Sequence, residues 1–208
     1  MSGAMRLCPK LQQMLRLLLG VLFGLTVRGR ENVPRRGGII IACNHISNLD
    51  PPVLGSAVPR PVSFMAKSEL FTTGAGAFFM PRLGAFPVNR RGVDTDALRT
   101  ALAELDGGKA VIVFPEGTRS HDGKMLPLKA GIGLIAARAG VPVVPAFIWG
   151  TDNPGRALAR SPRFTVGFDR PIPYSELAGA GGARKTTERI GAGIAGLGAR
   201  LVPGLDTA

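Results

Sequence analysis

The chain has 208 residues, a length typical of one domain, and 45% of them are hydrophobic, which excludes disorder of the low-hydrophobicity kind. Its two cysteines are too few for a disulfide framework or a four-cysteine zinc site. No Walker A loop, G-x-S-x-G elbow or H-E-x-x-H motif occurs, so P-loop enzymes, elbow-type serine hydrolases and zinc peptidases are not expected. We therefore expect one globular domain in a reducing compartment, with no metal site.

The net charge of +12 comes from 26 Lys and Arg against 14 Asp and Glu, and it indicates an anionic partner. Arginine accounts for 20 of the basic residues, and its planar guanidinium matches phosphate and carboxylate oxygens. Aromatic residues make up only 6% of the chain, which is too few for base-stacking platforms. We therefore expect a phospholipid surface, a phosphorylated substrate or an acidic protein as the partner, and no nucleic acid.

Leucines recur at helical spacing near the N-terminus, at Leu11, Leu15, Leu18, Leu22 and Leu25. The uninterrupted apolar run, residues 17–27, would span about 16 Å as a helix, against about 30 Å for the apolar core of a bilayer. Basic residues flank this run, namely Arg6, Lys10, Arg16, Arg28 and Arg30. We interpret residues 1–27 as an amphipathic, membrane-associated helix and residues 28–208 as the domain that follows. The alternative is a helix that packs against the core of that domain.

Apolar, β-branched runs alternate with helical segments along the rest of the chain. We predict strands at residues 38–43, 62–66, 86–88, 110–114, 143–147 and 164–168. Helices are predicted at 51–57, with Asp50 as the N-cap, at 95–105, at 129–139 and near the C-terminus. This alternation predicts an α/β fold: a single layered domain with a mixed, largely parallel sheet flanked by helices.

Polar residues gather in three loops that directly follow predicted strands, where α/β proteins place their chemistry. His45 and Asp50 lie in the first loop, and their separation of five residues would place them on different faces of a continuous helix. If the chain turns between them, Asp50 can accept a hydrogen bond from one imidazole nitrogen and leave the other as a base. The alternative is that Asp50 only caps the helix and His45 is an ordinary loop residue.

The other two loops carry candidate ligands for an anion. Arg90 ends the second loop and Arg119 lies in the third, and a guanidinium is a strong ligand for phosphate. Gly117 lets the backbone come close, and its N–H group can point at the same anion. Glu116 cannot itself favour a phosphate, so we expect it to orient an arginine or to hold the loop. The alternative for both arginines is a solvated surface position.

In order along the chain, these loops resemble the motifs of the glycerophospholipid acyltransferase family, specifically the bacterial 1-acylglycerol-3-phosphate acyltransferases. The pattern N-H-x-S-x-x-D matches residues 44–50, and G-x-F-P-V-x-R matches residues 84–90. The pattern F-P-E-G-T-R-S matches residues 114–120 without a gap, and V-P-x-x-P matches residues 141–145. One departure is Asn89, where many members have Asp. The resemblance covers about residues 28–170.

The resemblance implies an acyltransferase that moves a fatty acyl group from an acyl thioester to the 2-hydroxyl of lysophosphatidic acid, giving phosphatidic acid. It implies that His45 is the general base and that Asp50 orients it. It also assigns the acceptor phosphate to a set of six residues: Arg90, Glu116, Gly117, Thr118, Arg119 and Ser120. The donor it implies is acyl carrier protein or coenzyme A, as a thioester co-substrate, with no metal and no other cofactor.

Two alternatives to this function stay open. An acyltransferase of the same family could use another acceptor, such as glycerol-3-phosphate, a lyso-ornithine lipid or another lysophospholipid. A non-catalytic, basic peripheral membrane protein would account for the N-terminal helix and the charge, but not for His45, Asp50 and the third loop. From the lipid acceptor that the resemblance implies, we expect the enzyme at the cytoplasmic face of the cell membrane, as a peripheral or monotopic protein.

Overall fold

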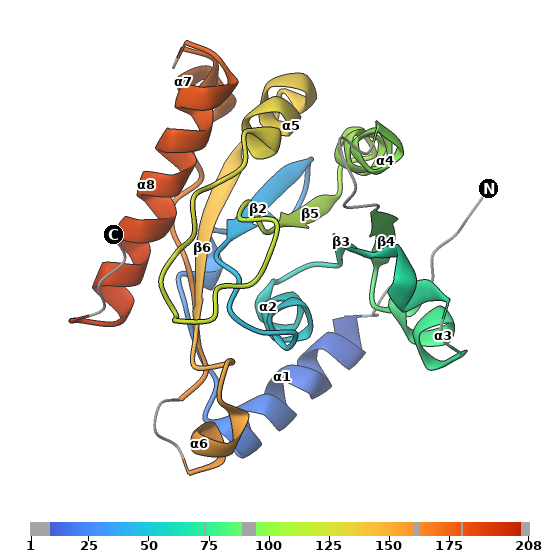
Figure 1. Cartoon of the computed structure of the whole chain (residues 1–208), viewed down its shortest axis with the longest axis vertical. Coiled ribbons are helices and arrows are strands. Elements are labelled where there is room, and N and C mark those ends of the chain that lie inside the picture. The colour runs from blue at the N-terminus through green and yellow to red at the C-terminus, as the bar shows by residue number, and fades with distance from the viewer. Residues whose placement is uncertain (1–8, 73, 89–94, 160–162, 180, 205–208) are drawn as a thin grey trace.

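The computed structural model describes residues 9–72, 74–88, 95–159, 163–179 and 181–204 (Figure 1). Arg6, Asn89 and Arg90 lie outside these ranges, so the predictions that concern them are not addressed by the structure. One seven-stranded sheet runs through the domain, and helices cover both of its faces (Figure 1). The single α/β domain that the alternation of elements predicts is therefore confirmed.

The sheet is mixed and largely parallel, as predicted. Side by side, its strands are β1 (Thr26–Arg28), β7 (Thr165–Phe168), β6 (Val143–Trp149), β2 (Ile39–Cys43), β5 (Ala110–Val113), β3 (Val62–Lys67) and β4 (Ala85–Val88). Every neighbouring pair is parallel except β6 and β7, which are antiparallel. Parallel neighbours bring their carboxyl ends to the same edge of the sheet, so the loops after β6, β2 and β5 lie next to one another.

Two apolar layers, one on each face of the sheet, hold the helices in place. The central strand β2 is buried at all five positions, and its side chains alternate between the layers. Ile39 and Ile41 face the layer that contains α1 (Pro9–Phe23) and α2 (Asp50–Ala57). Ile40 faces the layer formed by α4 (Thr95–Asp106), α5 (Gly131–Ala139) and α8 (Ala183–Leu201). A continuous β-branched run is what a strand covered on both faces requires.

The sequence did not predict several elements, because they are very short or because their composition argues against them. The first is β1, which has only three residues. A helix, α3 (Gly74–Arg82), forms although its sequence contains two glycines and Pro81. The remaining ones are α6 (Pro154–Leu158), α7 (Tyr174–Ala178) and two 3₁₀ turns, η1 (Arg30–Asn32) and η2 (Ser68–Phe71). Each is too short for a periodic pattern to develop.

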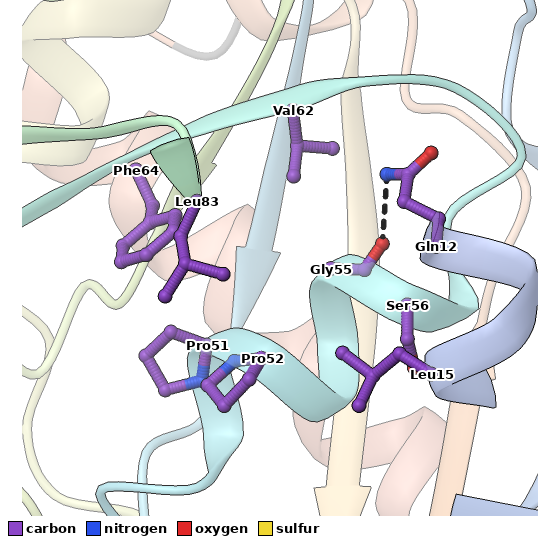
Figure 2. Close-up of a pocket in the computed structure, with 9 residues that line it drawn as sticks. All are labelled: Gln12, Leu15, Pro51, Pro52, Gly55, Ser56, Val62, Phe64 and Leu83. Carbon is purple, nitrogen blue, oxygen red and sulfur yellow. Dashed lines mark hydrogen bonds between the residues drawn. The ribbon is translucent and has the colours of Figure 1, made fainter. Parts of the chain in front are cut away.

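The N-terminal helix α1 packs against the domain along one face. Gln12 and Leu19 are buried, and Leu15 packs against the same apolar layer. Figure 2 shows the side chain of Gln12 reaching α2, where its Nε2 donates to the carbonyl oxygen of Gly55 at 3.1 Å. The same nitrogen also donates to the carbonyl oxygen of Arg60, at 3.1 Å. The packing of α1 on the core, given as an alternative above, therefore describes this face of the helix.

The opposite face of α1 is apolar and exposed. It carries Met14, Leu17, Leu18 and Val21, with exposed fractions between 52% and 70%, and Leu22 at 42%. The predicted leucine stripe is thus divided, because Leu15 points inward whereas Leu18 and Leu22 point outward. In the part of the chain that the structure describes, no helix is long and apolar enough to cross a membrane.

Close packing of α5 on α8 depends on the absence of a side chain at Gly133. A Cβ there would overlap the carbonyl oxygen of Ala183 and lie 2.7 Å from Thr187 Oγ1. We expect Gly133→Ala to lower the free energy of unfolding by about 1–3 kcal/mol, because one helix must move away from the other. Urea denaturation measures this change. Gly131→Ala is the control, since nothing lies within 4 Å of its Cβ position, and a comparable loss in that variant would contradict the packing argument.

Candidate active site

Two of the three predicted loops meet at the carboxyl edge of the sheet. His45 follows β2, the central strand, and residues 114–120 follow β5, which is its parallel neighbour. The two segments are joined directly, because the backbone N–H of Ser120 donates to the carbonyl oxygen of His45 at 2.8 Å. Most of the second predicted loop, residues 85–88, is instead strand β4 at the edge of the sheet, and its last residues, 89 and 90, lie outside the described ranges.

His45 and Asp50 form a buried pair, which is the first of the two possibilities that their spacing left open. The imidazole Nδ1 lies 2.7 Å from Asp50 Oδ2, the histidine side chain is 10% exposed, and the Asp50 side chain has no exposure. The same carboxylate oxygen accepts the backbone N–H groups of Ile46 at 2.7 Å and Ser47 at 2.8 Å. The chain therefore wraps around the Asp50 carboxylate, and this turn brings the two side chains together.

Asp50 does not cap α2, and the prediction of an N-cap there is wrong. The helix begins at Asp50 itself, its N-cap residue is Leu49, and no side chain caps it. The carboxylate points back along the chain toward His45 and cannot also reach the first amides of the helix. Pro51 lies in the first turn, where the missing N–H of proline needs no partner. The helix start is thus supported by proline and not by a side-chain cap.

The imidazole of His45 is held in one orientation by two contacts. A carboxylate accepts hydrogen bonds, so Nδ1–H donates to Asp50 and Nε2 carries the lone pair of the neutral ring. The ring of Phe114 stacks on the imidazole with centroids 4.2 Å apart and planes 24° apart. A cavity of about 500 Å³ borders His45. This arrangement is suited to general-base chemistry, because the basic nitrogen is oriented and an adjacent space can hold a substrate.

The cavity is lined by both polar and apolar side chains. The polar residues that line it are His45, Asn48, Lys67, Thr118 and Arg119. The apolar part of the lining includes Pro51, Pro52, Phe64, Met80, Leu83 and Phe114. A ligand with an anionic head and a hydrocarbon tail would match both parts of this lining. Lys67 was not singled out in the sequence, although its place at the end of β3 was the available signal.

Within the third loop, Thr118 and Arg119 line the cavity, whereas Glu116 is only 2% exposed. The two carboxylate oxygens of Glu116 accept the backbone N–H groups of His45 at 2.7 Å and Leu126 at 2.8 Å. Burial raises the pKa of the Glu116 carboxyl, and the two N–H donors oppose this shift. Of the two roles expected for Glu116, the structure shows the one that holds the loop.

Gly117 and Ser120 also stabilise the conformation of this loop. The N–H of Gly117, expected to point at an anion, instead donates to the carbonyl oxygen of Phe114 at 3.0 Å. Gly117 has a φ of 70°, and a Cβ there would run into the side chain of Lys129. Ser120 is buried, and its hydroxyl donates to Asp122 Oδ1 at 2.8 Å. Glycine is required at this turn because other residues rarely adopt a positive φ.

The described residues around the pair match neither a metal site nor a reactive cysteine. Among the residues that the structure describes, no three His, Cys, Asp or Glu side chains come together as metal ligands would. Cys43 is buried. Its burial is the main cause, and the nearby charges of Asp50 and Glu116 a further cause, of a thiol pKa well above the ordinary value. The interpretation of Cys43 as a small buried residue is confirmed, since a raised pKa suppresses the nucleophilic thiolate.

The chain is similar to known proteins in both sequence and fold. The family model described as Acyltransferase matches residues 24–149. The 1-acyl-sn-glycerol-3-phosphate acyltransferase of Bacillus subtilis (strain 168) is 32% identical over 165 residues, which cover 79% of this chain and 81% of that protein. The human 1-acyl-sn-glycerol-3-phosphate acyltransferase alpha is 32% identical over 141 residues, which cover 65% of this chain but only 50% of that protein.

A solved structure also matches. The crystal structure of the 1-acyl-sn-glycerophosphate (LPA) acyltransferase, PlsC, from Thermotoga maritima aligns with a TM-score of 0.72 and 28% sequence identity. The alignment covers 95% of this chain and 83% of that chain. The similarity therefore extends beyond the segment that carries the four motifs to nearly the whole fold.

Replacing Glu116 should loosen the connection between the third loop and His45. We expect Glu116→Ala to lower the free energy of unfolding by about 1.5–3 kcal/mol, because two backbone N–H groups lose a charged acceptor. Amide hydrogen exchange at His45 and Leu126 should become faster for the same reason. The control is Glu188→Ala, whose carboxylate is 60% exposed in a surface ion pair. Unchanged exchange at both amides in Glu116→Ala would contradict this role.

Proposed function

Because this chain belongs to the acyltransferase family, we propose that it transfers a fatty acyl group from an acyl thioester to the 2-hydroxyl of lysophosphatidic acid. The product is phosphatidic acid. The observation that carries the proposal is the buried His45–Asp50 pair at the border of a cavity lined by both polar and apolar side chains. The names of the relatives in Bacillus subtilis and Thermotoga maritima support this acceptor.

In the proposed reaction His45 is the general base. Its Nε2 takes the proton of the 2-hydroxyl while that oxygen attacks the thioester carbonyl carbon. The carbon–sulfur bond then breaks, and the thiol leaves with the proton that His45 carried. Asp50 holds the ring in the required tautomer and stabilises the imidazolium that forms. A thioester is already an activated acyl group, so the proposed step uses no metal and no other cofactor.

We place the acceptor phosphate against the third loop. Arg119 and Thr118 line the same cavity as His45, and Lys67 adds a second positive charge there. An arginine–phosphate contact is charge-assisted, and it would also fix the position of the 2-hydroxyl beside the base. Arg90 remains a proposed ligand on the strength of the motif. In the described structure Glu116, Gly117 and Ser120 support this loop from within, so their part in phosphate binding is proposed to be indirect.

The apolar side chains of the cavity are proposed to take the fatty acyl chain. Phe64, Met80 and Leu83 are among them, and they also belong to or pack against one apolar core layer. The acyl donor is a thioester of acyl carrier protein or coenzyme A. Both donors are anionic, and the net charge of +12 favours either one.

We further propose that α1 attaches the enzyme to the cytoplasmic face of the membrane. Met14, Leu17, Leu18 and Val21 are spaced as one helical face, and they stand exposed on the side that does not pack against the domain. An exposed apolar face next to basic residues is typical of a helix that lies in the membrane interface. The acceptor and the product are both lipids, so this attachment would bring the cavity to its substrate.

The alternatives differ in what they explain. A family member acting on glycerol-3-phosphate, a lyso-ornithine lipid or another lysophospholipid would use the same base and the same cavity. A non-catalytic peripheral protein would need the exposed face of α1, but it gives no reason for burying a histidine against a carboxylate. The reaction class therefore follows from the site, while the acceptor follows from the relatives.

The function is tested by acyl transfer from an acyl thioester to lysophosphatidic acid in detergent micelles. We expect phosphatidic acid from the wild-type protein, and a rate about 10²- to 10⁴-fold lower from His45→Ala, because the base is lost. The matched control is His121→Ala, since His121 is the other histidine of the chain and is exposed. Its rate should equal that of the wild type.

Each outcome has a distinct meaning. Wild-type turnover by His45→Ala would refute the base mechanism while leaving the substrate intact. If the folded wild type gives no product with either donor, lysophosphatidic acid is not the acceptor, and other lyso-lipids should be assayed. Absence of transfer to every acceptor would favour the non-catalytic alternative.

Membrane attachment is tested by flotation of the full chain with vesicles that contain anionic phospholipid. The double variant Leu17→Glu/Val21→Glu should bind at least about tenfold more weakly, because two apolar side chains can no longer enter the interface. Gln13→Glu adds a charge at an exposed polar position of the same helix and should bind nearly as well as the wild type. Point variants are preferable to deletion of residues 1–27, because strand β1 begins at Thr26. Equal flotation of the double variant would exclude this surface as the anchor.

A further inference from the structure

The Asp50 carboxylate has a partner that belongs to none of the three loops. Its Oδ2 is occupied by the His45 ring and by two backbone N–H groups. Its other oxygen, Oδ1, accepts the hydroxyl of Thr151 at 2.5 Å. Thr151 has no exposed surface, and it is 101 residues away from Asp50 in the sequence. The two oxygens thus have different tasks, since one faces the base and the other faces a distant threonine.

The fold brings Thr151 to this position through β6. That strand is the parallel neighbour of β2 on the side opposite β5, and Thr151 follows its end just as His45 follows the end of β2. Gly150 makes the turn with a φ of 83°, and a Cβ there would lie 2.7 Å from the carbonyl oxygen of Arg163. The backbone at this turn is thereby constrained, and the hydroxyl of the next residue meets the carboxylate.

We propose that Thr151 is a positioning residue for catalysis, acting through Asp50 on His45; this inference rests on the proposed function. The carboxylate can rotate about its bond to Cβ, and rotation would move Oδ2 away from Nδ1. The hydroxyl of Thr151 holds Oδ1 and so opposes this rotation. It also gives a buried anion a donor on the side that the His45 loop does not reach.

The alternative is that Thr151 only fills space beside Asp50, at the start of α2. The two roles differ in what they require of the side chain. A space-filling role depends on shape, which valine preserves, whereas the positioning role depends on the O–H group, which serine preserves. Substitution by valine and by serine therefore separates them.

The experiment measures kcat and the acceptor KM for Thr151→Val, Thr151→Ser and the wild type, using the lyso-lipid that the wild type acylates. We expect Thr151→Val to lower kcat by about 10- to 100-fold, since a charge-assisted hydrogen bond is lost, with the acceptor KM changed by less than about twofold. Thr151→Ser should retain kcat within about threefold of the wild type. Thr186→Val is the control, because that buried hydroxyl donates to the Leu177 carbonyl away from the site.

A second comparison shows whether the effect passes through Asp50. Adding Thr151→Val to an Asp50→Asn protein should change kcat by less than about twofold, because the acceptor of the hydroxyl has already been altered. If Thr151→Val does not fold, Thr151→Cys replaces it, and its weakly donating thiol should give a kcat below that of serine.

The results are distinguishable from those that bear on the function itself. Wild-type kcat in a folded Thr151→Val protein would overturn the inference and leave the reaction intact. Equal losses in the valine and serine variants, or a further full loss in the Asp50→Asn background, would also overturn it. A wild type that acylates no lyso-lipid would instead remove the proposed function on which the inference rests.

Discussion

The negative charge of Asp50 is enclosed by the protein, and the geometry of the site depends on how it is satisfied. The side chain has no solvent exposure, so its hydrogen-bond partners must come from the chain itself. Two backbone N–H groups and the His45 ring meet one oxygen, and the Thr151 hydroxyl meets the other. Satisfying this buried carboxylate therefore also shapes the loop after β2, orients the imidazole and joins β6 to the site.

Glu116 forms a second buried acidic centre, with a different task. Its carboxylate binds two backbone N–H groups, one from His45 and one from Leu126, and so connects the loops after β2 and β5. The side chains of Thr118 and Arg119, on the loop that Glu116 holds, line the cavity beside His45. One carboxylate thus orients the proposed base, while the other fixes the distance between that base and the proposed phosphate site.

Much of the fold and part of the candidate site could be predicted from the sequence, for physical reasons. The central strands are continuous β-branched runs, and such runs are typical of strands covered on both faces. The His45–Asp50 contact was one of two possibilities at that spacing, and sequence alone could not choose between them. The choice depended on whether the carboxylate turned forward to the helix or back to the loop.

Other features could not be predicted, because they arise from contacts distant in sequence. Thr151 follows β6 with no local pattern, and only the pairing of β6 with β2 brings it to Asp50. The N–H of Gly117 closes a turn, although glycine alone suggested an anion contact. The leucine periodicity of α1 indicated one apolar stripe, whereas the helix has a packed face and an exposed face. Hydrophobicity does not distinguish a face that packs on protein from one that remains exposed.

In the proposed reaction, the oriented base and the third loop hold one acceptor between them. A crystal structure of the protein with lysophosphatidic acid bound, without an acyl donor, would show whether they do. We expect a 2-hydroxyl within about 2.6–3.2 Å of His45 Nε2, the phosphate against Arg119, and an intact contact between Nδ1 and Asp50. A lipid whose phosphate binds elsewhere, with its hydroxyl turned away from His45, would contradict it.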